Sequence, residues 1–137
     1  MSEMVILDTH IWIWYVNENF DQIPAQWLEE IRQADIVGVS AISCYEIALA
    51  YNKGRLAIHI PVQDWLADSL APAGIELFPL TPEITVRAVN LSPIHKDPFD
   101  RLIIATALEY GAQIASVDSL FSKYPELTNH LMETKNI

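Results

Sequence analysis

Five acidic residues lie where apolar segments of this chain end, are interrupted, or give way to a helix. Asp8 and Asp118 each follow a short apolar run, and Glu46 is surrounded in sequence by apolar or small residues. Asp97 and Asp100 stand at the start of a predicted helix. Carboxylates that are brought close together repel one another unless they bind protons or a cation. A site built only from carboxylate oxygens favours Mg²⁺ or Mn²⁺ over Zn²⁺.

The chemistry open to such a site is phosphoryl chemistry, because a carboxylate-held Mg²⁺ can activate water and neutralise charge that develops on phosphate. A zinc site is not indicated. His10, His59, His95 and His130 are far apart in sequence, and Cys44 is the only cysteine. Cys44 lies in an apolar stretch, so we interpret it as a small core residue rather than a nucleophile.

A parallel sheet would carry the acids to one edge of the protein. Short apolar runs predict strands at residues 4–7, 36–39, 75–80 and 113–117. The segments between and after them predict helices at residues 10–16, 24–34, 40–52, 61–70, 81–91 and 98–110. Residues 131–137 are a candidate for a short edge strand. This alternation predicts an α/β fold with a mainly parallel sheet, whose strands end on the same side.

Most of these acids also have a structural role open to them. Asp97 precedes a proline and fits a helix N-cap, which places Asp100 at the third helical position, where an acid suits the helix dipole. Asp118 can cap the segment that follows it, and Thr9 can cap the helix predicted after the first strand. Glu46 has no comparable structural role, and a carboxylate among apolar neighbours is costly to bury without a partner.

Length and composition limit the class of protein. The 137 residues are 51% hydrophobic, which is enough for one folded domain spanning residues 1–137 and excludes a disordered chain. Eight Lys and Arg against 18 Asp and Glu give a net charge of −10, which disfavours nucleic-acid binding by charge alone. The N-terminus does not resemble a signal peptide, and no apolar run is long enough to cross a membrane, so we expect a cytoplasmic protein.

Five segments carry a family resemblance: residues 7–10 (LDTH), 40–48 (SAISCYEIA), 53–56 (KGRL), 95–107 (HKDPFDRLIIATA) and 116–118 (SVD). They resemble the PIN-domain family, and specifically the VapC-type toxin ribonucleases of bacterial toxin–antitoxin pairs. The resemblance spans nearly the whole chain in order, and the DPFDR block is its most specific part.

The resemblance implies a PIN-like three-layer α/β/α sandwich that cleaves RNA with Mg²⁺ or Mn²⁺. Its implied catalytic and metal-binding residues are Asp8, Glu46, Asp100 and Asp118. Thr9 matches the hydroxyl beside the first acid, and Asp97 is a cap, a supporting residue or a substitute ligand. Arg101 matches the basic residue of the DPFDR block, with an ion pair to a nearby acid as its alternative role. We expect His95, also typical of the family, to pack or form hydrogen bonds rather than act as a general base.

The resemblance also implies a small antitoxin partner and a homodimer. Trp12, Trp14 and Tyr15 are too apolar for a lone surface helix and belong either to the core or to such an interface. Two other functions stay open. A non-catalytic PIN-like interaction domain would be indicated by a missing acid, and none is missing. A metal-binding phosphoryl-transfer regulator would need a lysine after the last strand, and none stands at the expected place.

Overall fold

The protein is described by a computed structural model that covers residues 3–132. Within that range, four strands form one parallel sheet in the order β3-β2-β1-β4. The strands are β1 (Met4–Leu7), β2 (Ile36–Ser40), β3 (Glu76–Phe78) and β4 (Gln113–Ala115). The α-helices are α1 (Thr9–Val16), α2 (Ala25–Gln33), α3 (Ala41–Asn52), α4 (Val62–Asp68), α5 (Pro82–Val89) and α6 (Pro98–Tyr110).

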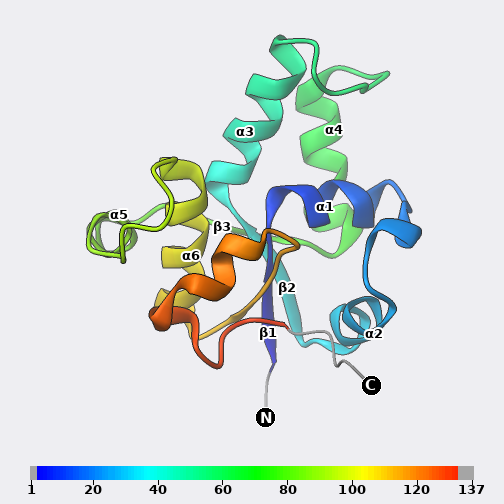
Figure 1. Cartoon of the computed structure of the whole chain (residues 1–137). Helices are drawn as coiled ribbons and strands as arrows, with labels where there is room; N and C mark the ends of the chain where they lie inside the picture. The colour runs from blue at the N-terminus through cyan, green and yellow to red at the C-terminus, as the bar shows by residue number, and fades with distance from the viewer. Residues whose placement is uncertain (1–2, 133–137) are drawn as a thin grey trace.

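The two faces of the sheet are covered by separate apolar cores. Val5 and Leu7 of β1 belong to a core with residues of α1, α2, α3 and α4, whereas Ile6 points to a second core with residues of α6. This alternation along one strand is the pattern of a strand buried on both faces. Figure 1 shows α5 and α6 on the opposite side of the sheet from α2. The predicted three-layer α/β/α sandwich is therefore confirmed.

The aromatic residues near the N-terminus belong mainly to the core. Trp12 is fully buried, its indole N–H donates to the Ser69 carbonyl at 2.9 Å, and its ring lies 5.4 Å from that of Trp65. Trp14 and Tyr15 are half-buried and pack against the same core. Of the two alternatives for Trp12, the core is correct.

Two predicted strands are longer than the observed ones. The fourth strand ends at Ala115 rather than at residue 117, and β3 spans only Glu76–Phe78. Leu131 forms an isolated parallel bridge with Ile114, while the rest of the predicted edge strand, residues 133–137, lies outside the described residues. Among residues 3–132, no helix has the length and apolar character needed to span a membrane.

Candidate active site

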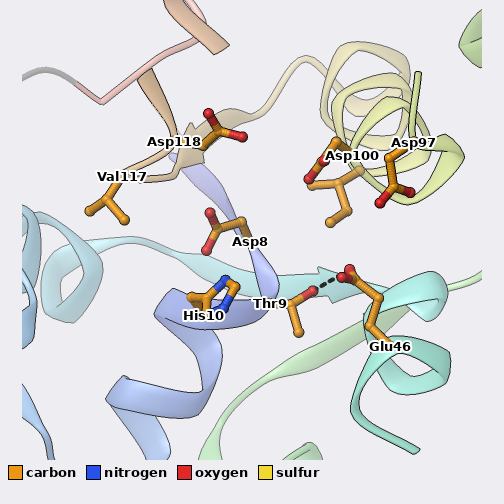
Figure 2. Close-up of a pocket in the computed structure, with 9 residues that line it drawn as sticks. Asp8, Thr9, His10, Glu46, Asp97, Asp100, Val117 and Asp118 are labelled. Carbon is orange, nitrogen blue, oxygen red and sulfur yellow. Dashed lines mark hydrogen bonds between the residues drawn. The ribbon is translucent and has the colours of Figure 1, made fainter. Parts of the chain in front are cut away.

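A cavity of about 390 Å³ opens beyond the carboxyl ends of β1 and β4. In the sheet, β2 lies on one side of β1 and β4 lies on the other, so the order of the strands reverses between β1 and β4. Open α/β sheets bind ligands at such a switch point. All five candidate acids line it, and Figure 2 shows them around a common space. The lining residues are Asp8, Thr9, His10, Glu46, Asp97, Asp100, Ile103, Val117 and Asp118.

Asp8 stands between β1 and α1 and is the N-cap of that helix. Its extended backbone lets Oδ1 accept the Ile11 N–H at 2.9 Å. The prediction that Thr9 caps this helix is therefore wrong. The side chain of Asp8 is almost fully buried, and burial raises its pKa, while hydrogen bonds from Ser116 and Ile11 oppose the rise.

Thr9 instead connects the first helix to Glu46 of α3. Its Oγ1 lies 2.7 Å from Oε1 of Glu46 and 2.8 Å from Oγ of Ser43. Because a carboxylate only accepts, Thr9 donates its single hydroxyl proton to Glu46. Burial is the main cause of the raised pKa of Glu46, and the nearby carboxylates of Asp100 and Asp97 raise it further. This acid therefore has a fixed orientation and an unfavourable charge.

Asp97 and Asp100 open α6 in two different ways. Oδ1 of Asp97 accepts the Phe99 N–H at 2.8 Å, so the predicted N-cap is confirmed, and the side chain is exposed. Asp100 is half-buried in the first helical turn. Burial first, and then the neighbouring carboxylates, raise its pKa to about 6, although His95 opposes the rise. The charged form of Asp100 is thus destabilised in the cavity, as are those of Asp8 and Glu46.

Asp118 follows β4 on a loop and is held from two directions. Oδ1 accepts the Leu120 N–H at 2.9 Å, and Oδ2 lies 3.0 Å from Nε2 of His95. The buried His95 ring contacts the Tyr124 hydroxyl through Nδ1 at 2.8 Å, and its Nε2 is 3.8 Å from Asp100. His95 therefore packs and forms hydrogen bonds, as expected, and it positions two of the acids.

His10 is the one titratable residue of the cavity lining that was not a candidate for the site from the sequence. It is exposed, lines the cavity, and its positive form would lower the pKa of both Asp8 and Glu46. The sequence did offer one indication: His10 lies in the first turn of the helix that begins directly after Asp8. Ser116, which hydrogen-bonds Asp8, had no signal of its own beyond its place two residues before Asp118.

Arg101 does not line the cavity and has a structural role. Its guanidinium donates to five backbone carbonyls, those of Ala88, Val89, Leu91, Ser92 and His95, at 2.8–3.3 Å. Within residues 3–132 it forms no ion pair, so that alternative is wrong. The planar fork of Arg101 instead ties the end of α5 and the His95 segment to α6.

Replacing Arg101 by Lys is expected to lower the free energy of unfolding by about 2–3 kcal/mol, because one ammonium cannot satisfy five carbonyls, four of which are bound in partly buried positions. Chemical denaturation measures the change. The matched control is Arg87→Lys, since Arg87 forms an exposed ion pair with Glu109 at 3.0 Å, and it should stay within about 0.5 kcal/mol of the parent. Equal stabilities for the two variants would contradict the role given to Arg101.

The donor set of the cavity fits a divalent cation. Burial first, and then the neighbouring carboxylates of the five lining acids, raise the pKa of Asp8, Glu46 and Asp100, and no lysine or arginine is among the lining residues to offset their charge. Ligand atoms of His95, Asp100 and Asp118 also lie within 4.8 Å of one another. Oxygen donors suit Mg²⁺ or Mn²⁺, and the imidazole suits Mn²⁺ better than Mg²⁺.

The parallel sheet in three layers, with a carboxylate-lined cavity at its switch point, defines the PIN class of α/β proteins. The chain belongs to the PIN-domain family, which its sequence matches over residues 5–127. It is similar to Ribonuclease VapC22 of Mycobacterium tuberculosis, with 36% identity over 118 residues, or 83% of this chain and 86% of that protein. The resemblance stated from the sequence is thus confirmed.

Solved structures share the fold. VapBC2 from Rickettsia felis, bound to a DNA fragment of its promoter, superposes with a TM-score of 0.69 at 18% identity, covering 94% of this chain and 97% of that one. The DNA-bound VapBC of Salmonella typhimurium has a TM-score of 0.58 at 15% identity, covering 92% and 95%. A toxin–antitoxin complex from Klebsiella pneumoniae has a TM-score of 0.57 at 18% identity, covering 97% and 99%.

Proposed function

We propose that this protein is a Mg²⁺- or Mn²⁺-dependent endoribonuclease and the toxin of a toxin–antitoxin pair. The observation that carries the proposal is that the acids selected from the sequence line one cavity at the switch point of the sheet. The relative named as a ribonuclease supports the reaction class. The proposed catalytic and metal-binding residues are Asp8, Glu46, Asp100 and Asp118, with Thr9 and Asp97 in support.

In this proposal each of four elements contributes one acid to a shared centre. Asp8 directly follows β1, Asp118 lies on the loop after the neighbouring strand β4, and Asp100 and Glu46 come from α6 and α3. A bound divalent cation would supply water activation and stabilisation of phosphate charge. Thr9 holds Glu46 in place, and His95 holds Asp118. The acids alone repel phosphate, so the cavity should accept an RNA backbone only after cation binding.

The reaction is tested with purified protein and a single-stranded RNA of mixed sequence. We expect endonucleolytic cleavage with millimolar Mg²⁺ or Mn²⁺ and none with excess EDTA. Asp64→Asn is a suitable control for protein quality, because Asp64 is an exposed acid of α4 outside the cavity. Cleavage that persists undiminished in EDTA would contradict a metal-dependent reaction.

The proposal includes a small antitoxin partner and a homodimer. The similar solved structures are named as VapBC or toxin–antitoxin complexes, which supports such a partner for this chain. A cavity with five acids and few nearby cations would favour a basic partner segment. The stoichiometry is measured by light scattering after size-exclusion chromatography of the chain alone and with its candidate antitoxin.

Metal binding has a readout that needs no RNA. A cation that binds only the folded state adds about 2.7 kcal/mol at a hundredfold excess over Kd, so millimolar Mn²⁺ should raise the melting temperature by roughly 5–10 °C. Glu46→Gln removes one ligand charge and should reduce that rise to less than half. Differential scanning fluorimetry with and without EDTA measures both.

Glu30→Gln makes the same charge change on an exposed position of α2 and should keep the full rise. An equal rise in Glu46→Gln and Glu30→Gln would mean that the cation acts by screening the net charge of −10, and it would remove Glu46 from the proposed site.

A further inference from the structure

An acidic nuclease needs something other than positive charge to hold its substrate. Several cations are already engaged in the fold: Arg101 with carbonyls, Arg87 with Glu109, and Arg32 over the Phe20 ring at 5.1 Å. With a net charge of −10, the chain gains little from phosphate contacts. Stacking of bases on aromatic side chains supplies affinity without positive charge.

Two aromatic rings stand beside the acids at the junction of α3 and α6. The rings of Tyr45 and Phe99 lie 5.5 Å apart at an angle of 57°. Each comes directly before a candidate ligand, Tyr45 before Glu46 and Phe99 before Asp100. Figure 2 shows both of those acids on the same side of the cavity. Neither ring lines the cavity itself, but the backbone that carries each ring is one residue from a lining acid, and the lining residue Asp97 accepts the Phe99 N–H at 2.8 Å.

Exposure distinguishes Tyr45 from the other aromatic residues near the site. Tyr45 is 56% exposed, the largest value for an aromatic side chain in residues 3–132, whereas Trp12 and Phe121 are at most 1% exposed. Trp12 therefore cannot stack on a base. Phe99 is half-buried at the start of α6, and its ring packs against that of Tyr45 and supports it from one side.

We propose that Tyr45, supported by Phe99, stacks on one base of single-stranded RNA whose neighbouring phosphodiester lies at the acidic cavity. This inference rests on the proposed function. A ring accepts any base, so the contact selects single strands rather than a sequence. One exposed ring suits one base, whereas a protein partner buries a much larger area than a pair of rings offers.

The test is steady-state cleavage of a short single-stranded RNA. Tyr45→Ala should raise KM roughly tenfold and leave kcat within about twofold, because stacking holds the substrate and does not act on the phosphodiester. Tyr45→Phe keeps the ring and should match the parent. Tyr51→Ala is the matched control, since Tyr51 is an exposed tyrosine near the other end of α3.

Substrates with single abasic positions around the cleaved bond identify the stacked base. One abasic position should raise KM for the parent about as much as Tyr45→Ala does, and it should add little in that variant. If Tyr45→Ala fails to fold, Tyr45→Leu, which keeps apolar bulk without a ring, takes its place. An unchanged KM in a folded ring-less variant overturns the stacking role.

These experiments distinguish failure of the proposed ribonuclease function from failure of the proposed stacking role of Tyr45. A parent protein that neither cleaves nor binds the RNA overturns both. If the parent cleaves the RNA and Tyr45→Ala has the same KM as the parent, only the stacking role of Tyr45 is overturned. Loss of co-purification with a protein partner in Tyr45→Ala, with KM for RNA unchanged, assigns the surface to that partner and likewise overturns the inference.

Discussion

Replacing Asp8 by Asn is expected to abolish RNA cleavage, with a loss on the order of 10³-fold or more, in a protein that stays folded. Asp8 is 7% exposed at the end of the central strand β1, so the change removes one charge from the middle of the proposed ligand set. Asn has the same size and is an equally good N-cap. Its Oδ1 can still accept the Ile11 N–H that Asp8 binds at 2.9 Å.

The stability of this variant distinguishes a lost ligand from a lost fold. Burial raises the pKa of Asp8, which means that its charge is unfavourable in the metal-free protein. The metal-free Asp8→Asn protein should therefore melt at or above the temperature of the parent, and added Mn²⁺ should raise it less. Asp64→Asn should behave as the parent in both assays. Full cleavage by a contaminant-free Asp8→Asn preparation would remove Asp8 from the site.

The convergence of the acids could be predicted because it follows from rules that act along the whole sheet. Asp8 and Asp118 follow apolar runs, and parallel strands end on the same side, so no knowledge of individual contacts was needed. The lengths of the strands could not be predicted in this way, because a strand ends where its pairing partner ends. Within residues 3–132, β4 pairs with the strand β1 in the register Val5–Gln113 to Leu7–Ala115, and on its other side it has an isolated bridge from Ile114 to Leu131. Because β1 ends at Leu7, no strand within residues 3–132 lies beside the chain beyond Ala115, and Val117 is 49% exposed.

The errors arise where a distant partner decides the role of a side chain. Asp8 and Thr9 are both good capping residues, and local preference does not choose between them. The difference comes from Glu46 of α3, whose Oε1 accepts a hydrogen bond from the Thr9 hydroxyl. Arg101 likewise binds carbonyls that come from the end of α5 and from the loop after it. No spacing in the sequence reports those carbonyls, because every residue carries one.

We expect the two acids at the start of α6, Asp97 and Asp100, to have different functions. Asp100→Asn should lose RNA cleavage by roughly 10²–10³-fold and bind Mn²⁺ more weakly, with little loss of stability. Asp97→Ser should keep much of the activity and lie within about 1 kcal/mol of the parent in stability, because serine is also a good N-cap. The basis is geometric: Asp97 is exposed and bound to the Phe99 N–H, whereas Asp100 is half-buried at the cavity.

The pH dependence of the metal-free protein gives a second readout for Asp100. Its pKa in the folded protein is about 6, against an ordinary value of 3.8. The folded state therefore binds this proton more tightly than the unfolded state, and stability falls as the pH rises from about 4 to about 6. Asp100→Asn should make that part of the melting profile less steep, and the raised pKa values of Asp8 and Glu46 should leave a smaller fall. Asp97→Ser should keep the fall, somewhat reduced, because the Asp97 charge contributes to the raised pKa of Asp100.

Opposite behaviour of the two variants would exchange their roles: an inactive, well-folded Asp97→Ser beside an Asp100→Asn that still cuts RNA. Loss of cleavage in both, with Asp97→Ser also failing to respond to Mn²⁺, would mean that Asp97 serves the metal as well as the helix. The cavity leaves room for that outcome, because Asp97 lines it and its charge raises the pKa of both Glu46 and Asp100. The hydrogen bond to Phe99 occupies Oδ1 alone, so the capping role assigns only one of the two oxygens of Asp97.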